Sequence, residues 1–428
     1  MDQPGPTTAN VTPDQITKLK RFLLEQAALR LRDLSKNSGD EPVIITVLLK
    51  EICEKARINL SPSMASEIVQ HVLSQVTGYG IIQPLLDDPT VSEIMVNGAQ
   101  NIYVEKSGLL HRTDLSFQSD AQVLELIQKI ITPLNRRIDP DQPMVDGRLP
   151  DGSRVNAVIP PVAIDGPSIT IRKFQRGKLG IDRLIELGTL SQHMSDFMKV
   201  CVLAKFNIIV SGGTGTGKTT LLNALSSYIP EKERIITIED AAELVMQQEH
   251  VVRMETKPGN PDGSGIVAIR DLVRNSLRMR PDRIVIGEVR GGEAMDMLQA
   301  MNTGHDGSMT TLHANTPRDA ISRLETMCLM SGVEIPLKVV RQQIASAIDL
   351  IIQVSREKDG SRKITAITEV VGMEGETVVL TDVFKYERKG ITPDGKVIGQ
   401  LKPTGIRPQF SARLEALGYR LGAEIFSS

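Results

Sequence analysis

The sequence predicts an α/β fold in its second half, preceded by a small α+β domain and an N-terminal helical bundle. From about residue 181, short apolar segments typical of buried strands alternate with amphipathic helical stretches. One such segment, residues 205–210, runs directly into a glycine-rich loop and then into a helix. That order is the local context of a phosphate-binding loop. The 428-residue length suits about two or three domains of ordinary size.

The N-terminal part is expected to be helical after a polar start. Residues 1–14 contain three prolines and are predicted to be disordered. Residues 15–78 place apolar side chains at helical spacing in the stretches 16–31, 43–56 and 61–76. A helical bundle is therefore expected, either as a docking module or as a structural cap on the next domain.

Residues 79–174 have a mixed pattern that predicts the α+β domain. Apolar residues alternate with polar ones in short segments, glycine-containing pairs mark turns, and a helix is expected at 121–131. Glycines in such pairs reach the backbone conformations that tight turns need. The expected strands are 93–96 and 101–104, and the expected turns are Asn97–Gly98, Asp146–Gly147 and Asp151–Gly152.

Residues 175–180 are the expected hinge, because movement of two domains must be absorbed by a few residues between them. Residues 181–428 should form a doubly wound sheet that ends in antiparallel strands. The expected antiparallel strands are 350–354, 364–370 and 378–386, and a final helix is expected near 413–421.

The glycine-rich loop matches the pattern of a phosphate cradle. Its glycines let backbone N–H groups surround a β-phosphate, and the N-terminus of the following helix adds a partial positive charge. Lys218 is expected to reach the β- and γ-phosphates, and the Thr219 hydroxyl to bind Mg²⁺. ATP is favoured over GTP, since no Asn-Lys-x-Asp segment is present. The expected nucleotide-binding residues are Gly212, Gly213, Thr214, Gly215, Thr216, Gly217, Lys218, Thr219 and Thr220.

Two later strands are expected to end in acids. Glu239 and Asp240 follow one apolar segment, and Glu288 follows another. Ligands of open α/β sheets bind beyond the carboxyl ends of strands, so these acids should face the phosphates. Glu288 is expected to orient or deprotonate the attacking water, and Glu239 to help hold Mg²⁺. Asp240 could equally cap a helix, and Gly287 stands where magnesium-binding strands usually carry an aspartate.

A histidine and several arginines extend the candidate site. His313 ends a further expected strand, where it could sense the γ-phosphate or be a structural residue, and His305 has a weaker claim to the same role. Arg290 follows Glu288 and is a candidate for neutralising charge on the transferred phosphoryl group. The other arginines near the acids could act likewise or pair with acids: Arg253, Arg270, Arg274, Arg278, Arg280 and Arg283.

These motifs, in this order, resemble the secretion-superfamily ATPases that power type II and type IV secretion and type IV pili. Residues 212–219 resemble that family's Walker A box, and 237–244 its Asp box. Residues 284–290 resemble its atypical Walker B box, and 304–315 its His box. The resemblance extends from about Gly78 to the end of the sequence.

Three stretches are most similar to the CpaF branch of this family, the Tad/Flp pilus motors. They are residues 278–291, 298–307 and 404–414. The branch implies a hexameric ATPase that couples hydrolysis to assembly, and possibly retraction, of a Tad/Flp-type pilus. A type IV secretion ATPase that drives substrate translocation is the alternative, because it would share every nucleotide motif.

The resemblance also implies how the domains cooperate. A RecA-like motor domain would bind ATP and Mg²⁺, and arginines of the preceding domain would approach the phosphates. The matching residues are Arg154 and, with less weight, Arg148 and Arg172, which could instead be ordinary strand-surface residues. The implied partners are other copies of the chain in a hexamer and inner-membrane platform proteins.

The composition limits other functions. The formal net charge is −2, tryptophan is absent and aromatic residues make up 3% of the chain, so direct binding of nucleic acid is not expected. The three cysteines lie far apart and form no CxxC pair, which is typical of a reducing cytoplasm and unlike the zinc-bearing branch of the family. No signal peptide or membrane-spanning run is evident, so we expect a cytoplasmic protein that reaches the inner membrane through partners. A RecA-like nucleic-acid motor and a non-catalytic ATP-binding scaffold remain alternatives.

Overall fold

The computed structural model divides the chain into two compact units, Met1–Gln175 and Arg176–Ser428. It describes residues 16, 18–20, 22–23, 26–27, 41–56, 58–76, 78–106, 108–134, 136–174, 179–257, 259, 264–393 and 395–427. The prediction of disorder for residues 1–14 lies outside the described residues, as do residues 175–178 of the predicted hinge 175–180 and half of the first predicted helix, 16–31.

The first unit begins with a helical bundle. Its helices α2 (Glu41–Ala56) and α3 (Pro62–Val76) occupy the positions predicted from the apolar spacing. Ile45 and Leu49 of α2 are buried together with Ile68 and Val72 of α3. This separate small core agrees with the predicted helical bundle.

The rest of the first unit is a six-stranded antiparallel sheet in the order β3-β2-β1-β6-β5-β4. Helix α5 (Asp120–Ile131) buries Val123, Ile127 and Ile131 in the core that it shares with the sheet. Residues of β1, β2, β5 and β6 alternate between this core and the opposite face, which is mainly polar. The other elements are α4 (Gln83–Asp87), β1 (Val91–Asn97), β2 (Asn101–Lys106), β3 (Leu109–Arg112), β4 (Met144–Arg148), β5 (Arg154–Val158) and β6 (Ser168–Arg172).

The turn predicted at Asp146–Gly147 is wrong. Both residues lie inside β4, where Gly147 pairs with Val155 of β5. A Cβ atom on Gly147 would lie 2.9 Å from Leu134 Cδ1 and 3.0 Å from Ile131 Cδ1. Glycine is therefore needed there to make room for apolar side chains. The real turn includes Gly152, whose φ of 95° is in the left-handed region.

The second unit is built on a nine-stranded sheet in the order β15-β14-β13-β12-β7-β11-β10-β8-β9. The strands from β12 to β9 are parallel. Strands β13, β14 and β15 follow β12 at the other end, each antiparallel to its neighbour. Strands β9 and β15 were not predicted. The bounds are β7 (Ile208–Gly212), β8 (Ile235–Glu239), β9 (Val251–Glu255), β10 (Arg283–Ile286), β11 (Met309–Leu312), β12 (Leu350–Arg356), β13 (Arg362–Glu374), β14 (Thr377–Ile391) and β15 (Val397–Pro403).

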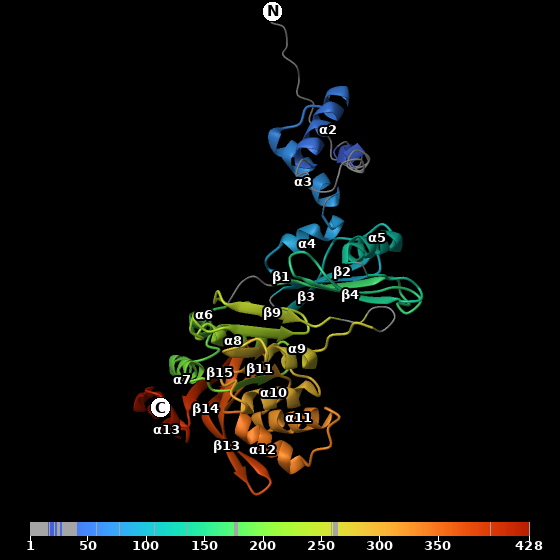
Figure 1. Ribbon diagram of the computed structural model, residues 1–428. Helices are drawn as coiled ribbons and strands as arrows, with labels where there is room; N and C mark the ends of the chain where they lie inside the picture. Colours follow the sequence, from blue (N-terminus) through green and yellow to red (C-terminus); the bar gives the residue numbers. More distant parts are fainter. Residues whose placement is uncertain are drawn as a thin grey trace, which may run out of the picture. The chain divides into compact units, whose positions relative to one another are not determined.

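Helices cover both faces of this sheet, so the central strands are buried and read as nearly continuous apolar runs. Helices α6 (Ile181–Glu186), α7 (Gln192–Leu203), α8 (Lys218–Ser226) and α13 (Ser411–Ala416) contribute to the core on one face. The other core is formed by α9 (Ile269–Ser276), α10 (Glu293–Asn302), α11 (Pro317–Leu329) and α12 (Leu337–Ala347), of which the last three lie together in Figure 1. The predicted α/β fold class is confirmed. In the described part of the chain, no helix is long and apolar enough to cross a membrane.

The parallel register brings the motifs to one edge of the sheet. Leu312 pairs with Ser211, and Ile286 pairs with both Ile238 and Thr310. The residues that follow β7, β8, β10 and β11 therefore all leave from the same edge, where ligands of such sheets bind.

Candidate active site

The phosphate loop joins β7 to α8. Gly217 precedes α8 with φ of 93°, a conformation that favours glycine. A Cβ atom on Gly212 would lie 2.5 Å from the Val354 carbonyl oxygen, so the neighbouring strand β12 also requires glycine. The Thr216 hydroxyl donates to the Gly213 carbonyl at 2.9 Å, and Lys218 Nζ donates to the same oxygen at 2.9 Å. The loop is thus held in a closed turn at the start of a helix.

Lys218, His313 and Glu288 form one cluster. Lys218 Nζ lies 3.4 Å from His313 Nε2, and that nitrogen lies 2.8 Å from Glu288 Oε1. Burial lowers the pKa of Lys218, Arg290 lowers it further, and Glu288 opposes the shift. Burial and the charge of Lys218 also lower the pKa of His313, so its imidazole is neutral at pH 7.

Glu288 is held ionised by its neighbours. Burial raises its pKa, but a hydrogen bond from Arg290, the charge of His313 in its protonated form, and the charges of Arg290 and Lys218 outweigh this and lower it. The Arg290 guanidinium donates to Glu288 Oε2 at 2.7 Å, and its other terminal nitrogen lies 3.7 Å from Asp240 Oδ2. An ionised carboxylate beside the phosphate loop can accept a proton or orient a water molecule.

Glu239, at the end of β8, has different surroundings. Its Oε1 accepts hydrogen bonds from the backbone N–H groups of Glu243 at 2.8 Å and Leu244 at 2.9 Å. Its Oε2 is buried and has no hydrogen-bond partner among the described residues. Burial raises the pKa of Glu239 to about 7, although the two backbone hydrogen bonds and Arg253 oppose the shift. Glu239 therefore holds the following loop through one oxygen and leaves the other available.

The position of Gly287 explains why the usual aspartate is missing. A Cβ atom on Gly287 would lie 2.8 Å from Glu239 Cγ and 3.3 Å from Glu239 Oε1. Its carbonyl oxygen accepts a hydrogen bond from the Thr311 hydroxyl at 2.7 Å. Glu239 thus fills the space that an aspartate side chain would need. Thr311 lies within the stretch 304–315 but was not predicted as a site residue, because its contact with Gly287 depends on the pairing of β10 with β11.

Of the other arginines near the acids, at least three have structural partners. Arg283 is fully buried and donates to Glu233 and to the Val202 carbonyl. Arg270 and Arg274 both donate to Asp296 at 2.7 Å. These contacts favour the acid-partner interpretation over a role on phosphate.

His305 and Arg283 also lie on the wrong edge of the sheet for catalysis. Arg283 begins β10 and His305 precedes β11, so both are at the amino ends of parallel strands. The phosphate loop is at the carboxyl ends. Arg278 and Arg280 precede β10 and belong to that same opposite edge.

The three arginines of the first unit form a row across its sheet. Arg154 of β5 pairs with Arg148 of β4 on one side and with Arg172 of β6 on the other. Arg172 pairs in turn with Glu93 of β1. Directly paired residues have side chains on the same face of a sheet, so the row presents three guanidinium groups together.

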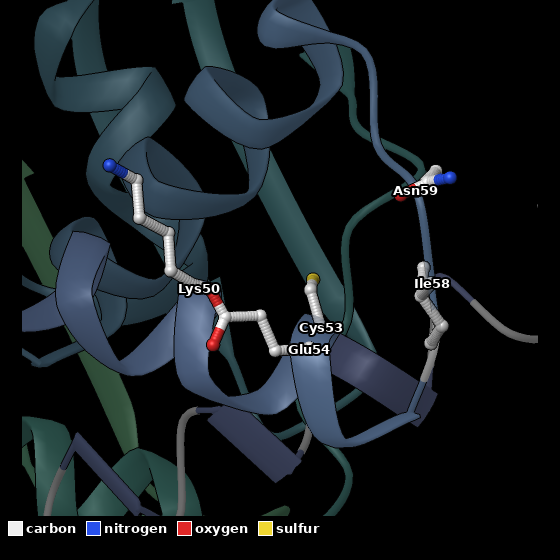
Figure 2. Close-up of a pocket in the computed structure, with 5 residues that line it drawn as sticks. All are labelled: Lys50, Cys53, Glu54, Ile58 and Asn59. Atoms are coloured by element: carbon white, nitrogen blue, oxygen red, sulfur yellow. The ribbon is translucent and has the colours of Figure 1, made fainter.

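A shallow pocket lies in the helical bundle, and none of these residues lines it. It has a volume of about 370 Å³ and is lined by Lys50, Cys53, Glu54, Ile58 and Asn59. Figure 2 shows that the Lys50, Glu54 and Asn59 side chains point in different directions instead of converging. The pocket therefore offers no arrangement for a nucleotide.

The residues present fit ATP and Mg²⁺. The positive end of α8, the Lys218 ammonium and the turn around Gly217 provide what a polyphosphate requires. The unpartnered buried oxygen of Glu239 is a carboxylate donor of the kind that Mg²⁺ prefers. Thr219 and Thr220 are half-buried in the first turn of α8.

Residues 75–382 match the family model described as type II/IV secretion system protein. A putative conjugal transfer protein of Mycobacterium tuberculosis strain H37Rv is 34% identical over 334 residues, which are 77% of this chain and 94% of the relative. The conjugal transfer protein TrbB of Rhizobium radiobacter is 33% identical over 295 residues, 68% of this chain and 86% of the relative. The type IV secretion system protein PtlH of Bordetella pertussis is 34% identical over 312 residues, 66% and 91% of the two chains.

The chain also resembles a solved ATPase in fold. The structure of the pilus retraction motor PilT with bound ADP superposes with a TM-score of 0.50 at 21% identity, covering 67% of this chain and 80% of that chain. This similarity concerns the fold alone and agrees with a RecA-like P-loop domain. The relatives named for conjugal transfer and type IV secretion support the alternative function better than the pilus-assembly prediction. The chain belongs to the family of type II/IV secretion system ATPases.

Proposed function

We propose that the chain is the Mg²⁺-dependent ATPase of a type IV secretion machine and converts ATP hydrolysis into translocation of a substrate. The observation that carries the proposal is the cluster of Lys218, His313 and Glu288 beside the phosphate loop. The relatives named for conjugal transfer and type IV secretion, which match this chain over most of their length, support the choice of machine.

In the proposed mechanism, the chain's own residues hold the nucleotide and activate water. The backbone of residues 212–217 and the Lys218 ammonium bind the β- and γ-phosphates. Thr219 and Glu239 would hold Mg²⁺, which would neutralise charge on the phosphates. The ionised Glu288 accepts the proton of the attacking water or orients it.

His313 and Arg290 link Glu288 to the rest of the site. A neutral imidazole between Lys218 and Glu288 can change partners when a γ-phosphate attracts Lys218, so His313 would report the nucleotide state. Arg290 binds Glu288 and also approaches Asp240, which couples the ends of β10 and β8.

The arginine row of Arg148, Arg154 and Arg172 is proposed to approach the phosphates when the first unit closes over the second. Such closure would carry the mechanical work, and residues 175–180 are its proposed hinge. We further propose a homohexamer that works on the cytoplasmic side of the inner membrane with platform proteins, without direct insertion into the membrane or direct binding of nucleic acid.

Assembly of a Tad/Flp-type pilus is the second candidate. It is favoured by the similarity of residues 278–291, 298–307 and 404–414 to the CpaF branch. Both functions use the same hydrolysis chemistry, so biochemical activity does not separate them.

A genetic experiment separates them. The gene is deleted in its native cell and restored with wild-type protein, with Glu288→Gln, or with the control Glu334→Gln, whose side chain is exposed on the loop before α12. Secreted protein, plasmid transfer to recipient cells and surface pili are then measured in each strain. We expect secretion or transfer to return with wild type and Glu334→Gln only. Loss of pili with unchanged secretion and transfer would replace the proposal by pilus assembly, and restoration by Glu288→Gln would remove hydrolysis from the function.

A further inference from the structure

The turn between β12 and β13, residues 357–361, lies beside the phosphate loop although it belongs to none of the motifs. Strand β12 pairs in parallel with β7, and Val354 lies opposite Gly212. The two residues that end β12 therefore extend past the start of the loop, at the edge of the sheet where ligands bind. The turn adds side chains to that edge from a distant part of the sequence.

Arg362, the first residue of β13, contacts the tip of the phosphate loop. Its Nε donates to the Gly215 carbonyl oxygen at 3.4 Å. A Cβ atom on Gly217 would lie 3.8 Å from Arg362 Cδ, so the aliphatic part of the side chain lies against the loop as well. Because the side chain is exposed, part of its guanidinium remains open to a ligand.

The local charges favour an anion at this place. Arg362 pairs directly with Arg356 across the two strands, and like charges in that arrangement destabilise a sheet. The acids of the turn are engaged elsewhere: Asp359 accepts from the N–H groups of Ser361 and Val397, and Glu357 pairs with Arg388. A bound polyphosphate would offset the repulsion between the two arginines.

We propose that Arg362 is a nucleotide-positioning residue that holds the tip of the phosphate loop and places positive charge beside a bound nucleoside di- or triphosphate. The inference rests on the proposed ATP site and adds a residue that lies outside its four motifs. The loop surrounds the β-phosphate, which ADP and ATP share, so Arg362 should strengthen the binding of both.

The expected signature is a change in binding without a change in chemistry. Loss of one charged hydrogen-bonding group should raise the Kd for ADP and the KM for ATP by about tenfold. The kcat at saturating ATP should stay close to that of wild type, because a contact made equally in the ground state and the transition state does not alter it. A merely structural role would lower the melting temperature and the active fraction without this separation.

The test uses the full chain and titrates ADP by calorimetry, with ATPase kinetics alongside. Arg362→Ala and Arg362→Gln are compared with wild type, and Lys358→Ala, on the exposed side of the same turn, is the matched control. Weaker ADP binding by both arginine variants, with an unchanged control, supports the inference. Wild-type affinity in Arg362→Ala, or equal weakening in Lys358→Ala, overturns it. Failure of the wild-type chain to bind ADP would overturn the proposed ATP site itself.

Discussion

The ends of the neighbouring strands β8 and β10 each carry a glutamate, and the two side chains have opposite surroundings. Glu288 faces Arg290, His313 and Lys218, and its pKa is lowered. Glu239 is almost fully buried, and backbone N–H groups donate hydrogen bonds to one of its oxygens. Its pKa is raised to about 7. The same side chain is thus an ionised group on one strand and a buried, loop-holding group with a raised pKa on the next.

A glutamate's position at the end of a strand therefore does not by itself assign it a catalytic role. The cations around Glu288 keep it ionised, whereas Glu239 holds the backbone of Glu243 and Leu244 through one oxygen and has no hydrogen-bond partner among the described residues for the other. The burial of one carboxylate and the pairing of the other separate their tasks.

The largest expected effect comes from Glu288→Gln. The amide keeps the size of the side chain but cannot accept a proton, so we expect kcat to fall by about 10²–10⁴-fold while ATP binding is retained. Phosphate release and nucleotide affinity are measured on the purified chain. Glu239→Gln is the matched comparison on β8, and an equal loss of kcat in both variants would contradict the separation of roles.

The next effect concerns the pH dependence of stability. The pKa of Glu239 is raised from 4.5 in the unfolded chain to about 7 in the folded chain. The folded state therefore binds the proton more tightly than the unfolded state. The resulting contribution to the unfolding free energy is complete below pH 4.5 and is lost as the pH rises through 7. We expect the loss to be about 3 kcal/mol of unfolding free energy in the nucleotide-free protein.

Glu239→Gln tests this directly, since the amide does not titrate. Urea unfolding is followed at several pH values in the variant, in wild type and in the exposed control Glu334→Gln. In Glu239→Gln, the unfolding free energy should no longer decline between pH 4.5 and about pH 7. A wild-type decline that persists in Glu239→Gln would show that another group causes it.

A smaller effect is expected from Gly287→Ala, which tests whether the two strands share space. The added methyl group would lie 2.8 Å from Glu239 Cγ, so Glu239 must shift. Overpacking of this kind costs about 1–3 kcal/mol in stability. Gly390→Ala on β14 has nothing within 4 Å of the added Cβ and serves as the control for thermal unfolding. Equal stability of the two variants would contradict the close fit between Gly287 and Glu239.

The sequence predicts those parts of the site whose residues are close together in the chain, and not those that depend on contacts between distant residues. The phosphate loop and the strands before Glu239 and Glu288 were predictable, because each is local and continuous in sequence. The opposite pKa shifts were not, since Glu288 is influenced by His313 and Lys218, which are distant in sequence, and Glu239 is buried by the tertiary fold. Arg362 was missed for the same reason, because only the pairing of β12 with β7 brings it to the loop.

The smallest expected effect on stability is that of Arg290, the residue that links the two strand ends. Its side chain is 60% exposed, so its pairs with Glu288 and Asp240 should contribute less than about 1 kcal/mol. Its effect on chemistry should be larger than its effect on stability, because Arg290 is the first of the groups that lower the pKa of Glu288. In Arg290→Gln we expect the acidic limb of the pH–rate profile to move to higher pH with little change in melting temperature. Arg253→Gln, on β9 beside Glu239, is the comparison, and an equal shift there would mean that the acidic limb does not report Glu288. A limb that stays in place in Arg290→Gln would show instead that His313 and Lys218 are enough to keep Glu288 ionised.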